Sequence, residues 1–416
     1  MSGQSPTVWH AWSPSEWPKA PRWMSFSTLL EVEACPRRWA LCAADYPYVW
    51  ERPGYPRTPQ TSTLEGTVVH LALEKISHAL AKRGCQSLTD ESAFCTLKDL
   101  GGYTVIIANC IDCALRPYKG NPRATPVLDE VRQQLERQSP KLRTRIQRLL
   151  SRIHLVSRND VQLDTAAHHI EVSGHQLPHG SHAEVKLQVP DLGWQGVADF
   201  LTLSSASCEI RDFKTGISKP QHEFQLRTYA LLWARDLNLN PSGRLADKLV
   251  LSYDDSDVEV PPPREKELRF LENEVRRRTA AVCADLRINP PETRPSQQTC
   301  PHCIVRHLCE EYWQWHARQR EDSEPSGVQF TDLQIKLSAR HGPASWDSIV
   351  ESSSHTNVDQ PILLRTSNIP FDLHPGQRIR LLNIHVSISK EECLEEEPPQ
   401  VVATMGVSTE IFLIPR

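Results

Sequence analysis

Two short charged patterns on neighbouring β-prone segments constrain this chain more than any other feature. Residues 196–200 read Gly-Val-Ala-Asp-Phe and residues 208–214 read Cys-Glu-Ile-Arg-Asp-Phe-Lys, with the alternation of half-buried strands. Because side chains alternate across a strand, Asp212 and Lys214 project from the same face. If the two segments form a hairpin, Asp199 approaches Asp212 at one end of it. Converging carboxylates repel each other unless a divalent cation lies between them, so the pattern predicts a site for a hard metal ion.

Three further side chains are placed to serve such a site. Lys214 supplies a fixed positive charge that suits phosphodiester hydrolysis, because it can orient a water molecule or stabilise charge on a phosphate. Gln225 and Tyr229 lie four residues apart, hence on one helical face, and His70 lies in an amphipathic helical segment. Structural alternatives stay open at this point: a solvent-facing ion pair, a core histidine, and a Gln/Tyr pair that only covers the sheet.

In this order, Asp199, Asp212 with Lys214, and Gln225 with Tyr229 resemble the signature of the PD-(D/E)XK nucleases of the RecB type. Segment 66–74, which contains His70, is similar to the family's helix that brings a histidine to the site. The resemblance implies an α/β fold, with a mixed sheet flanked by helices, and a metal-dependent deoxyribonuclease. It implies catalytic roles for Asp199, Asp212, Lys214, Gln225 and Tyr229, and Mg²⁺ or Mn²⁺ bound by His70, Asp199, Asp212 and the backbone carbonyl of Phe213.

The cysteines provide a second signal. Of the 12 cysteines, Cys300, Cys303 and Cys309 lie within ten residues, at a C-x2-C-x5-C spacing that is typical of metal sites. A fourth ligand is needed. Locally, His302 or His307 would complete a Cys₃His zinc site.

The remote candidate for the fourth ligand is Cys35. The segment around Cys35 resembles the iron–sulfur branch of RecB-like nucleases, which includes AddB-type subunits of helicase–nucleases and nucleases of CRISPR adaptation. In that branch one cysteine before the nuclease core and three after it hold a [4Fe-4S] cluster. The resemblance therefore implies Cys35, Cys300, Cys303 and Cys309 as cluster ligands, and we interpret the cluster as a structural staple.

Composition shifts along the 416 residues predict the domain organisation. We expect an N-terminal arm at 1–24, a nuclease domain at 25–320, a charged linker at 321–327 and a β domain at 328–416. Within the nuclease domain we expect a helical region at 60–155, a catalytic sheet at 183–253 and a cysteine knuckle at 300–309. The β domain contains six short β-prone runs and resembles an OB-fold, a small five-stranded barrel that often binds single strands.

The charge distribution and the remaining motifs indicate which partners to expect, namely DNA and a helicase subunit. The net charge of −4 does not by itself indicate nucleic-acid binding, but a segment with Arg143, Arg145, Arg148 and Arg152 interleaves basic residues with a Leu/Ile stripe and is a candidate contact for DNA. No phosphate-binding loop of the P-loop helicases occurs, so any unwinding requires a separate helicase subunit. We expect single-strand or DNA-end cleavage, as an exonuclease or endonuclease, within a repair or antiviral defence complex. A catalytically silent DNA-binding scaffold is the alternative. No apolar run is long enough to span a membrane, and the expected location is a prokaryotic cytoplasm.

Overall fold

The structure is a computed structural model that describes residues 8–156, 176–319, 329–354, 356–366, 372–389, 400–406 and 408–415. The chain forms two compact units. The sheet unit consists of Ala20–Leu30 and Arg57–Ala284, and the barrel unit consists of the chain up to Lys19, Glu31–Pro56 and the chain from Asp285 onward. The predicted linker 321–327 lies outside the described residues. Among the described helices, none combines the length and the apolar character that a membrane crossing requires.

A mixed five-stranded sheet forms the centre of the sheet unit. Its strands follow the order β2-β3-β4-β5-β6, with β4 and β5 parallel and the other pairs antiparallel. The strands are β2 (Gly180–Val189), β3 (Trp194–Leu203), β4 (Cys208–Phe213), β5 (Lys248–Ser252) and β6 (Asp257–Val260). A parallel pair needs a crossover, and here the crossover contains α8 (Pro220–Arg235). The mixed sheet expected from the sequence is confirmed.

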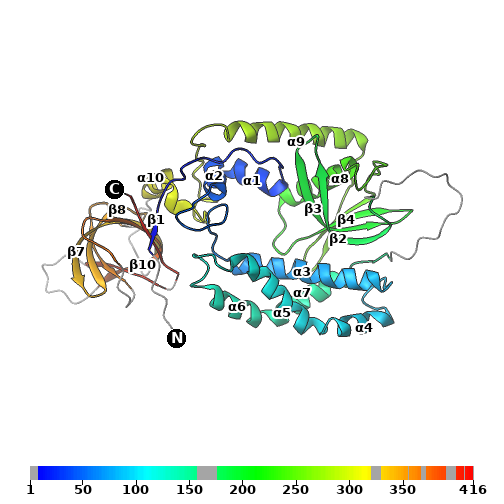
Figure 1. Ribbon diagram of the computed structural model, residues 1–416, viewed down its shortest axis with the longest axis horizontal. Coiled ribbons are helices and arrows are strands. Elements are labelled where there is room, and N and C mark those ends of the chain that lie inside the picture. Colours follow the sequence, from blue (N-terminus) through cyan, green and yellow to red (C-terminus); the bar gives the residue numbers. More distant parts are fainter. Residues whose placement is uncertain are drawn as a thin grey trace. The chain divides into compact units, whose positions relative to one another are not determined.

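Helices cover both faces of this sheet (Figure 1). Helix α3 packs on β2, with α5, α6 and α7 behind it, whereas α8 contacts β2, β3, β4 and β5 from the other side. The bounds are α3 (Thr61–Lys82), α4 (Glu91–Asp99), α5 (Gly102–Leu115), η1 (Arg116–Tyr118), α6 (Leu128–Arg137), α7 (Ser139–Leu150) and α9 (Glu265–Asp285). The apolar stripe of α3, with Val69, Leu73 and Ile76, shares a core with Phe200 and Phe213 of the sheet. This packing sets one face of α3 over the strands that contain Asp199 and Asp212.

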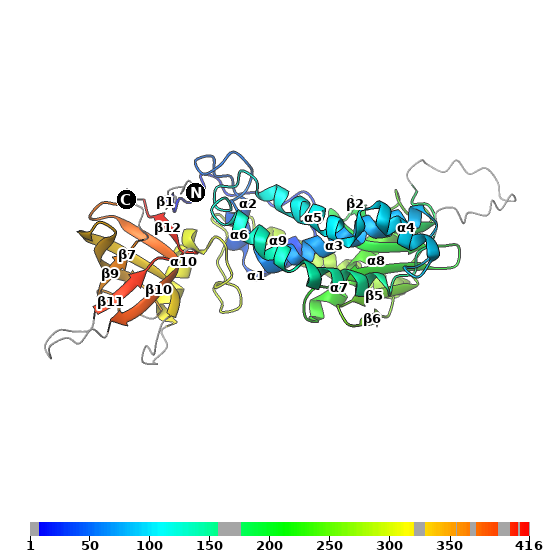
Figure 2. The same ribbon diagram turned by 90° about the horizontal axis from the view of Figure 1, so that it is seen from below.

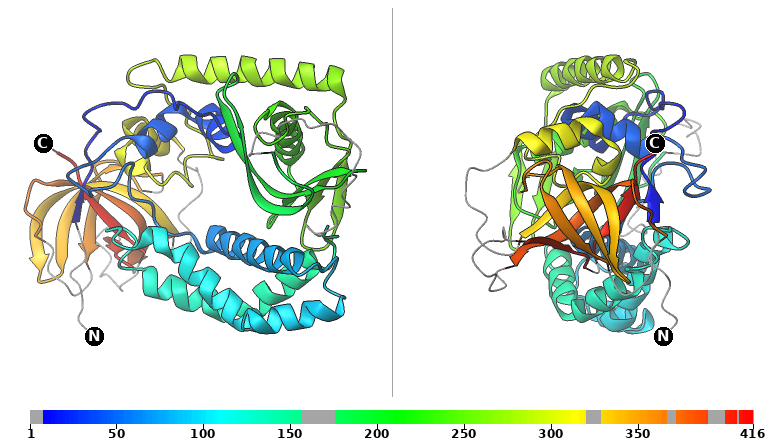
Figure 3. Two further views of the ribbon diagram at one scale, coloured as in Figure 1. Left: turned by 45° about the vertical axis from the view of Figure 1, so that its right-hand side comes forward. Right: turned by 90° about the vertical axis from the view of Figure 1, so that its left-hand side faces the viewer.

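A closed β-barrel dominates the barrel unit (Figures 2 and 3). Its five strands follow the cyclic order β7-β8-β9-β11-β10-β7, in which only β9 and β11 are parallel. This is the OB-like barrel expected from the sequence. The bounds are β7 (Gln329–Gly342), β8 (Ser345–Ser352), β9 (Pro361–Arg365), β10 (Arg378–Ser389) and β11 (Gln400–Thr404).

Two strands extend the barrel sheet from β10. The last strand, β12 (Glu410–Leu413), pairs antiparallel with β10, and β1 (Val8–His10) pairs parallel with β12. The sequence did not predict β1, because three residues are too few to show a period. Helix α1 (Phe26–Ala34) spans the change from one unit to the other, and the barrel unit also contains α2 (Pro36–Ala43), η2 (Arg306–Leu308) and α10 (Glu310–Arg318).

Candidate functional site

The two predicted carboxylates meet between β3 and β4. The pair Phe200 and Arg211 is in register, so Asp199 and Asp212 face each other one step further along the two strands. Asp199 Oδ2 accepts a hydrogen bond of 2.6 Å from the backbone N–H of Phe213. The hairpin inferred from the sequence therefore does bring both aspartates to one point.

Glu184 joins this group, and sequence reasoning missed it. In the β2–β3 register Glu184 lies between the pairs Ala183–Phe200 and Val185–Ala198, which sets it opposite Asp199. Like charges opposite each other destabilise a sheet, and Glu184 also has a φ of +52°, which is uncommon for a residue with a side chain. Both features are costs that functional sites tolerate. Counting outward from the turn before Trp194 would have paired Glu184 with Asp199.

His70 approaches the same carboxylates from α3. Its Nδ1 lies 3.4 Å from Asp199 Oδ1 and 4.0 Å from Glu184 Oε1. One ligand atom from each of these three residues lies within 4.8 Å of the others. Burial lowers the pKa of His70, but the hydrogen bond and the charge of Asp199 outweigh it and the net pKa is raised.

Asp212 is the most buried member of the group, at 2% exposure. Burial, and next the charge of Asp199, raise its pKa, although the Lys214 ammonium that pairs with it acts in the opposite direction. Burial together with Asp199 likewise raises the pKa of Glu184 to about 7. The buried Asp212 Oδ2 lies against the Lys214 ammonium. Raised pKa values at two carboxyl groups that crowd against Asp199 are what a divalent cation would relieve, so the donor set fits a hard metal ion.

Gln225 and Tyr229 of α8 hold Lys214 in place. Lys214 Nζ donates to Gln225 Oε1 at 2.7 Å, and Gln225 Nε2 donates to Tyr229 Oη at 2.8 Å. This close approach of α8 requires Gly196, because a Cβ there would lie 2.9 Å from the Tyr229 ring. The structure thus brings all five predicted catalytic side chains, together with the Phe213 backbone and His70, to one place in the sheet unit.

A hollow of about 770 Å³ opens beside this group, between α3, Glu184 and the loop after β4. Hydroxyl groups of Ser62, Thr63 and Thr67 line it together with His70. Gly66 allows the loop to approach α3, because a Cβ at Gly66 would lie 2.9 Å from Thr215 Oγ1.

We expect Gly66→Ala to lower turnover by about tenfold, because Thr215 and the adjacent Lys214 would have to shift. The fold would persist, since alanine favours a helix by about 1 kcal/mol over glycine. The measurement is kcat on an oligonucleotide, alongside a thermal melt. Thr215→Ala removes the obstructing hydroxyl, so the double variant should regain the activity of Thr215→Ala alone. A double variant as slow as Gly66→Ala would contradict the steric explanation.

The arginines proposed to contact DNA lie on and just after α7 and have protein partners. Arg145 pairs with Asp254, Arg148 Nη1 lies 2.7 Å from Asp255 Oδ1, and Arg152 Nε lies 3.2 Å from Asp257 Oδ1. Arg143 instead stacks over Tyr103, with 5.4 Å from its guanidinium carbon to the ring centroid. Carboxylates of the β5–β6 turn and of the first residue of β6 therefore offset three of the four charges, and contact with nucleic acid stays a prediction.

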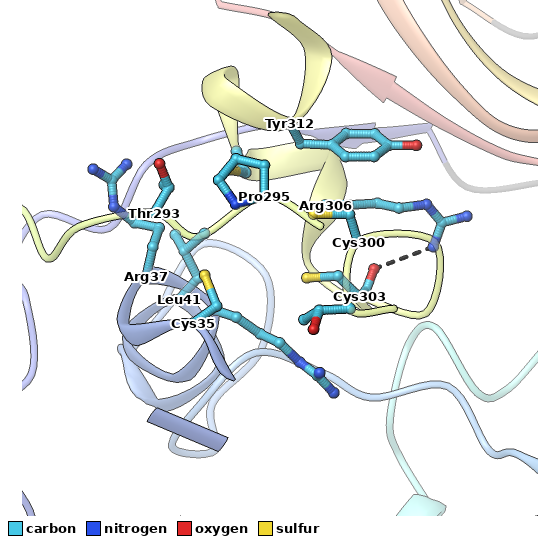
Figure 4. A pocket seen from close by; sticks show the side chains of 12 residues that line it. Cys35, Arg37, Leu41, Thr293, Pro295, Cys300, Cys303, Arg306 and Tyr312 are labelled. Carbon is cyan, nitrogen blue, oxygen red and sulfur yellow. Dashed lines mark hydrogen bonds between the residues drawn. The ribbon is translucent and has the colours of Figure 1, made fainter. Parts of the chain in front are cut away.

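The four cysteines implied by the resemblance line one cavity of the barrel unit. Cys35 precedes α2, and the other three come from the segment before α10. In Figure 4 the sulfur atoms of Cys35, Cys300 and Cys303 point into a common space, and Cys309 also lines this cavity of about 20 Å³. Burial raises the thiol pKa of Cys303 to about 11 and that of Cys309 to about 12. Four thiol donors that line one cavity fit a soft metal or an iron–sulfur cluster.

Neither local histidine lines this cavity. His307 is fully buried, its Nε2 lies 2.7 Å from Tyr55 Oη, and its ring stacks on Phe412 at a centroid distance of 3.8 Å. His302 is exposed. The geometry therefore favours Cys35 over either histidine as the fourth donor.

Two buried polar contacts connect strands of the barrel to the cysteine segment. Arg306, three residues after Cys303, pairs with Asp332 of β7, which also accepts a hydrogen bond of 2.7 Å from Tyr312 Oη. Arg380 of β10 donates to the carbonyl oxygen of His307 at 2.6 Å. Both contacts join the cysteine segment to strands of the same unit, and removing one partner of the buried Arg306–Asp332 pair would be strongly destabilising.

Comparison with known proteins assigns the family. A profile of the PD-(D/E)XK nuclease superfamily matches residues 23–310, which is more than half of the chain. The chain belongs to the PD-(D/E)XK nuclease superfamily. Membership implies phosphodiester hydrolysis with a divalent metal ion and a DNA substrate.

Two other comparisons add little. None of the curated proteins matches the chain. A solved structure described as the crystal structure of SSO0001 shares 21% sequence identity over 32% of this chain and 61% of its own, with a TM-score of 0.20. A likeness of that extent carries no assignment of function.

Proposed function

We propose that this protein is a divalent-metal-dependent deoxyribonuclease that cleaves single strands or DNA ends. The observation that carries the proposal is the convergence of His70, Glu184, Asp199 and Asp212 beside a lysine. A scaffold that only bound DNA would have no physical need for converging carboxylates, which destabilise the metal-free protein.

In this proposal the side chains have different roles, namely metal binding and stabilisation of charge. His70, Glu184, Asp199, Asp212 and the backbone carbonyl of Phe213 would hold one or two Mg²⁺ or Mn²⁺ ions. When bound, the cation polarises the scissile phosphate and lowers the pKa of an attacking water. Lys214 stabilises the charge that develops on the phosphate.

The position of Lys214 supports this role. Asp212 and Gln225 both contact its Nζ, so little reorganisation is needed when charge develops on the substrate. Tyr229, hydrogen-bonded to Gln225, completes the support and lies beside the DNA backbone in this proposal.

We further propose that Cys35, Cys300, Cys303 and Cys309 bind a [4Fe-4S] cluster. The support is the single cavity that these four residues line, together with the spacing that resembles the iron–sulfur branch. The proposed role is structural, because the cluster would join residues more than 260 positions apart in the chain.

The proposed setting is a DNA-processing, repair or antiviral defence complex in a prokaryotic cytoplasm. The chain has no P-loop of its own, so a separate helicase subunit would supply single strands. The OB-like barrel is a candidate module for holding such a strand.

Digestion of end-labelled oligonucleotides tests the activity. We expect cleavage of single-stranded DNA with Mg²⁺ or Mn²⁺ and none with excess chelator. Labels at either end report the polarity of cleavage, and an RNA strand of the same sequence reports the sugar preference. Binding of DNA without cleavage under either metal would instead support the scaffold function.

A further inference from the structure

A short loop, residues 214–219, connects β4 to α8 and presents one exposed apolar side chain. Ile217 is 78% exposed, and its neighbours in the loop are glycine or polar residues. A single exposed apolar residue is ordinary on a protein surface. The anchoring and the position of this loop set Ile217 apart.

Other elements hold the loop on both sides of Ile217. Before it, Arg145 Nη2 donates to the carbonyl oxygen of Thr215 at 2.8 Å. After it, Tyr253 Oη donates to Ser218 Oγ at 3.2 Å. His222 in turn lies against Tyr253, with 2.9 Å between Nδ1 and Oη. The backbone thus holds Ile217 out into solvent at a defined place.

The loop lies between two hollows, and Ile217 lines one of them. The hollow of about 770 Å³ contains His70 and Glu184, and a second one of about 510 Å³ contains Ile217 and Tyr253. Thr215 and Gly216 line both hollows, so the loop forms the ridge between them. A strand that leaves the carboxylate group across this ridge meets Ile217. Lys219 lines the first hollow and offers its ammonium group to phosphates there, whereas Asp254 and Asp255 line the second hollow.

We propose that Ile217 packs against the face of an unstacked base and thereby selects single-stranded over duplex substrate. This inference rests on the proposed nuclease function and names a determinant of its substrate class. The faces of nucleobases are apolar, and along a chain they are accessible where a strand is unpaired or splayed. Inside a duplex the bases remain stacked, so apart from its terminal base pairs a duplex offers an isoleucine no apolar base surface.

Binding assays in an uncleaving background test the proposal. All variants of the binding assay carry Asp199→Asn, and the probes are a single strand and a covalently closed circular duplex, which has no terminal base pair, each with one 2-aminopurine at successive positions. We compare Ile217→Ala, Ile217→Phe and, as a matched control, Leu237→Ala, which removes a side chain that is 69% exposed elsewhere in the sheet unit.

We expect Ile217→Ala to weaken single-strand binding about tenfold, with duplex binding unchanged within about twofold, and to abolish the fluorescence change at one probe position. Ile217→Phe should retain both signals, and Leu237→Ala should behave as the parent. Equal single-strand affinities for Ile217→Ala and Leu237→Ala would overturn the proposal. Ile217→Ala is also made without Asp199→Asn and compared with wild type in a cleavage assay. Single-strand cleavage that this substitution leaves unchanged overturns only this inference, whereas no binding or cleavage by wild type overturns the proposed function as well.

Discussion

Asp199→Asn is expected to abolish cleavage, with a loss of at least about 1000-fold in kcat, while DNA binding persists. Asp199 lies within reach of His70, Glu184 and the Phe213 amide, so its charge is central to the group. Asparagine keeps the volume and removes the charge. Contacts with phosphates elsewhere survive, and the site repels DNA less.

Stability distinguishes this effect from misfolding. Removing one of several crowded carboxylates relieves repulsion, which offsets the weakening of the hydrogen bonds that Asp199 makes with the Phe213 N–H and with His70, so the unfolding free energy should stay within about 1 kcal/mol of wild type. Mg²⁺ or Mn²⁺ should raise the melting temperature of wild type but not of the variant. Asp129→Asn, an exposed aspartate on α6, is the matched control and should cleave normally. Cleavage by Asp199→Asn at the wild-type rate, with contaminating nucleases excluded, would eliminate the proposed mechanism.

Cys35→Ser is expected to remove a cluster and to destabilise the barrel unit by several kcal/mol, on the order of a structural metal site. Protein purified without oxygen should be brown and contain equal amounts of iron and acid-labile sulfide. The variant should be colourless, because three thiols from a single segment remain without the donor that precedes α2.

Cys42→Ser provides the control for this experiment. Cys42 belongs to α2, the helix that follows Cys35, but it does not line the cavity of the four cysteines, so this variant should remain brown. Metal analysis of all three proteins decides the assignment. A colourless wild type with stoichiometric zinc that Cys35→Ser leaves in place would contradict the cluster.

The parts of the site that follow from local periodicity were predictable. The alternation around Asp199 and Asp212, and the four-residue spacing of Gln225 and Tyr229, gave the correct hairpin and the correct face of α8. Glu184 was missed because a single glutamate in a strand matches no local sequence motif. Its role at the site becomes visible only from the strand register, which sets it opposite Asp199.

Contacts between residues far apart in the sequence could not be predicted from local patterns either. Arg145, Arg148 and Arg152 belong to a basic stripe in the sequence, but their carboxylate partners lie about 100 residues later, in the β5–β6 turn and at the start of β6, whose place depends on the whole sheet. The meeting of Cys35 with the 300–309 segment likewise came from family resemblance and not from any periodicity.

The order in which the units occur along the chain has a consequence for biosynthesis. The sheet unit is complete at Ala284, whereas the barrel unit needs residues from both ends of the chain, since β1 pairs with β12 and Cys35 shares its cavity with Cys309. Domains fold as units while the chain emerges from the ribosome. The carboxylate site can therefore form early in translation, while the N-terminal segment waits unpaired until the last strand is made. Assembly of the four-cysteine cavity is then a late step, and it follows the folding of the sheet unit.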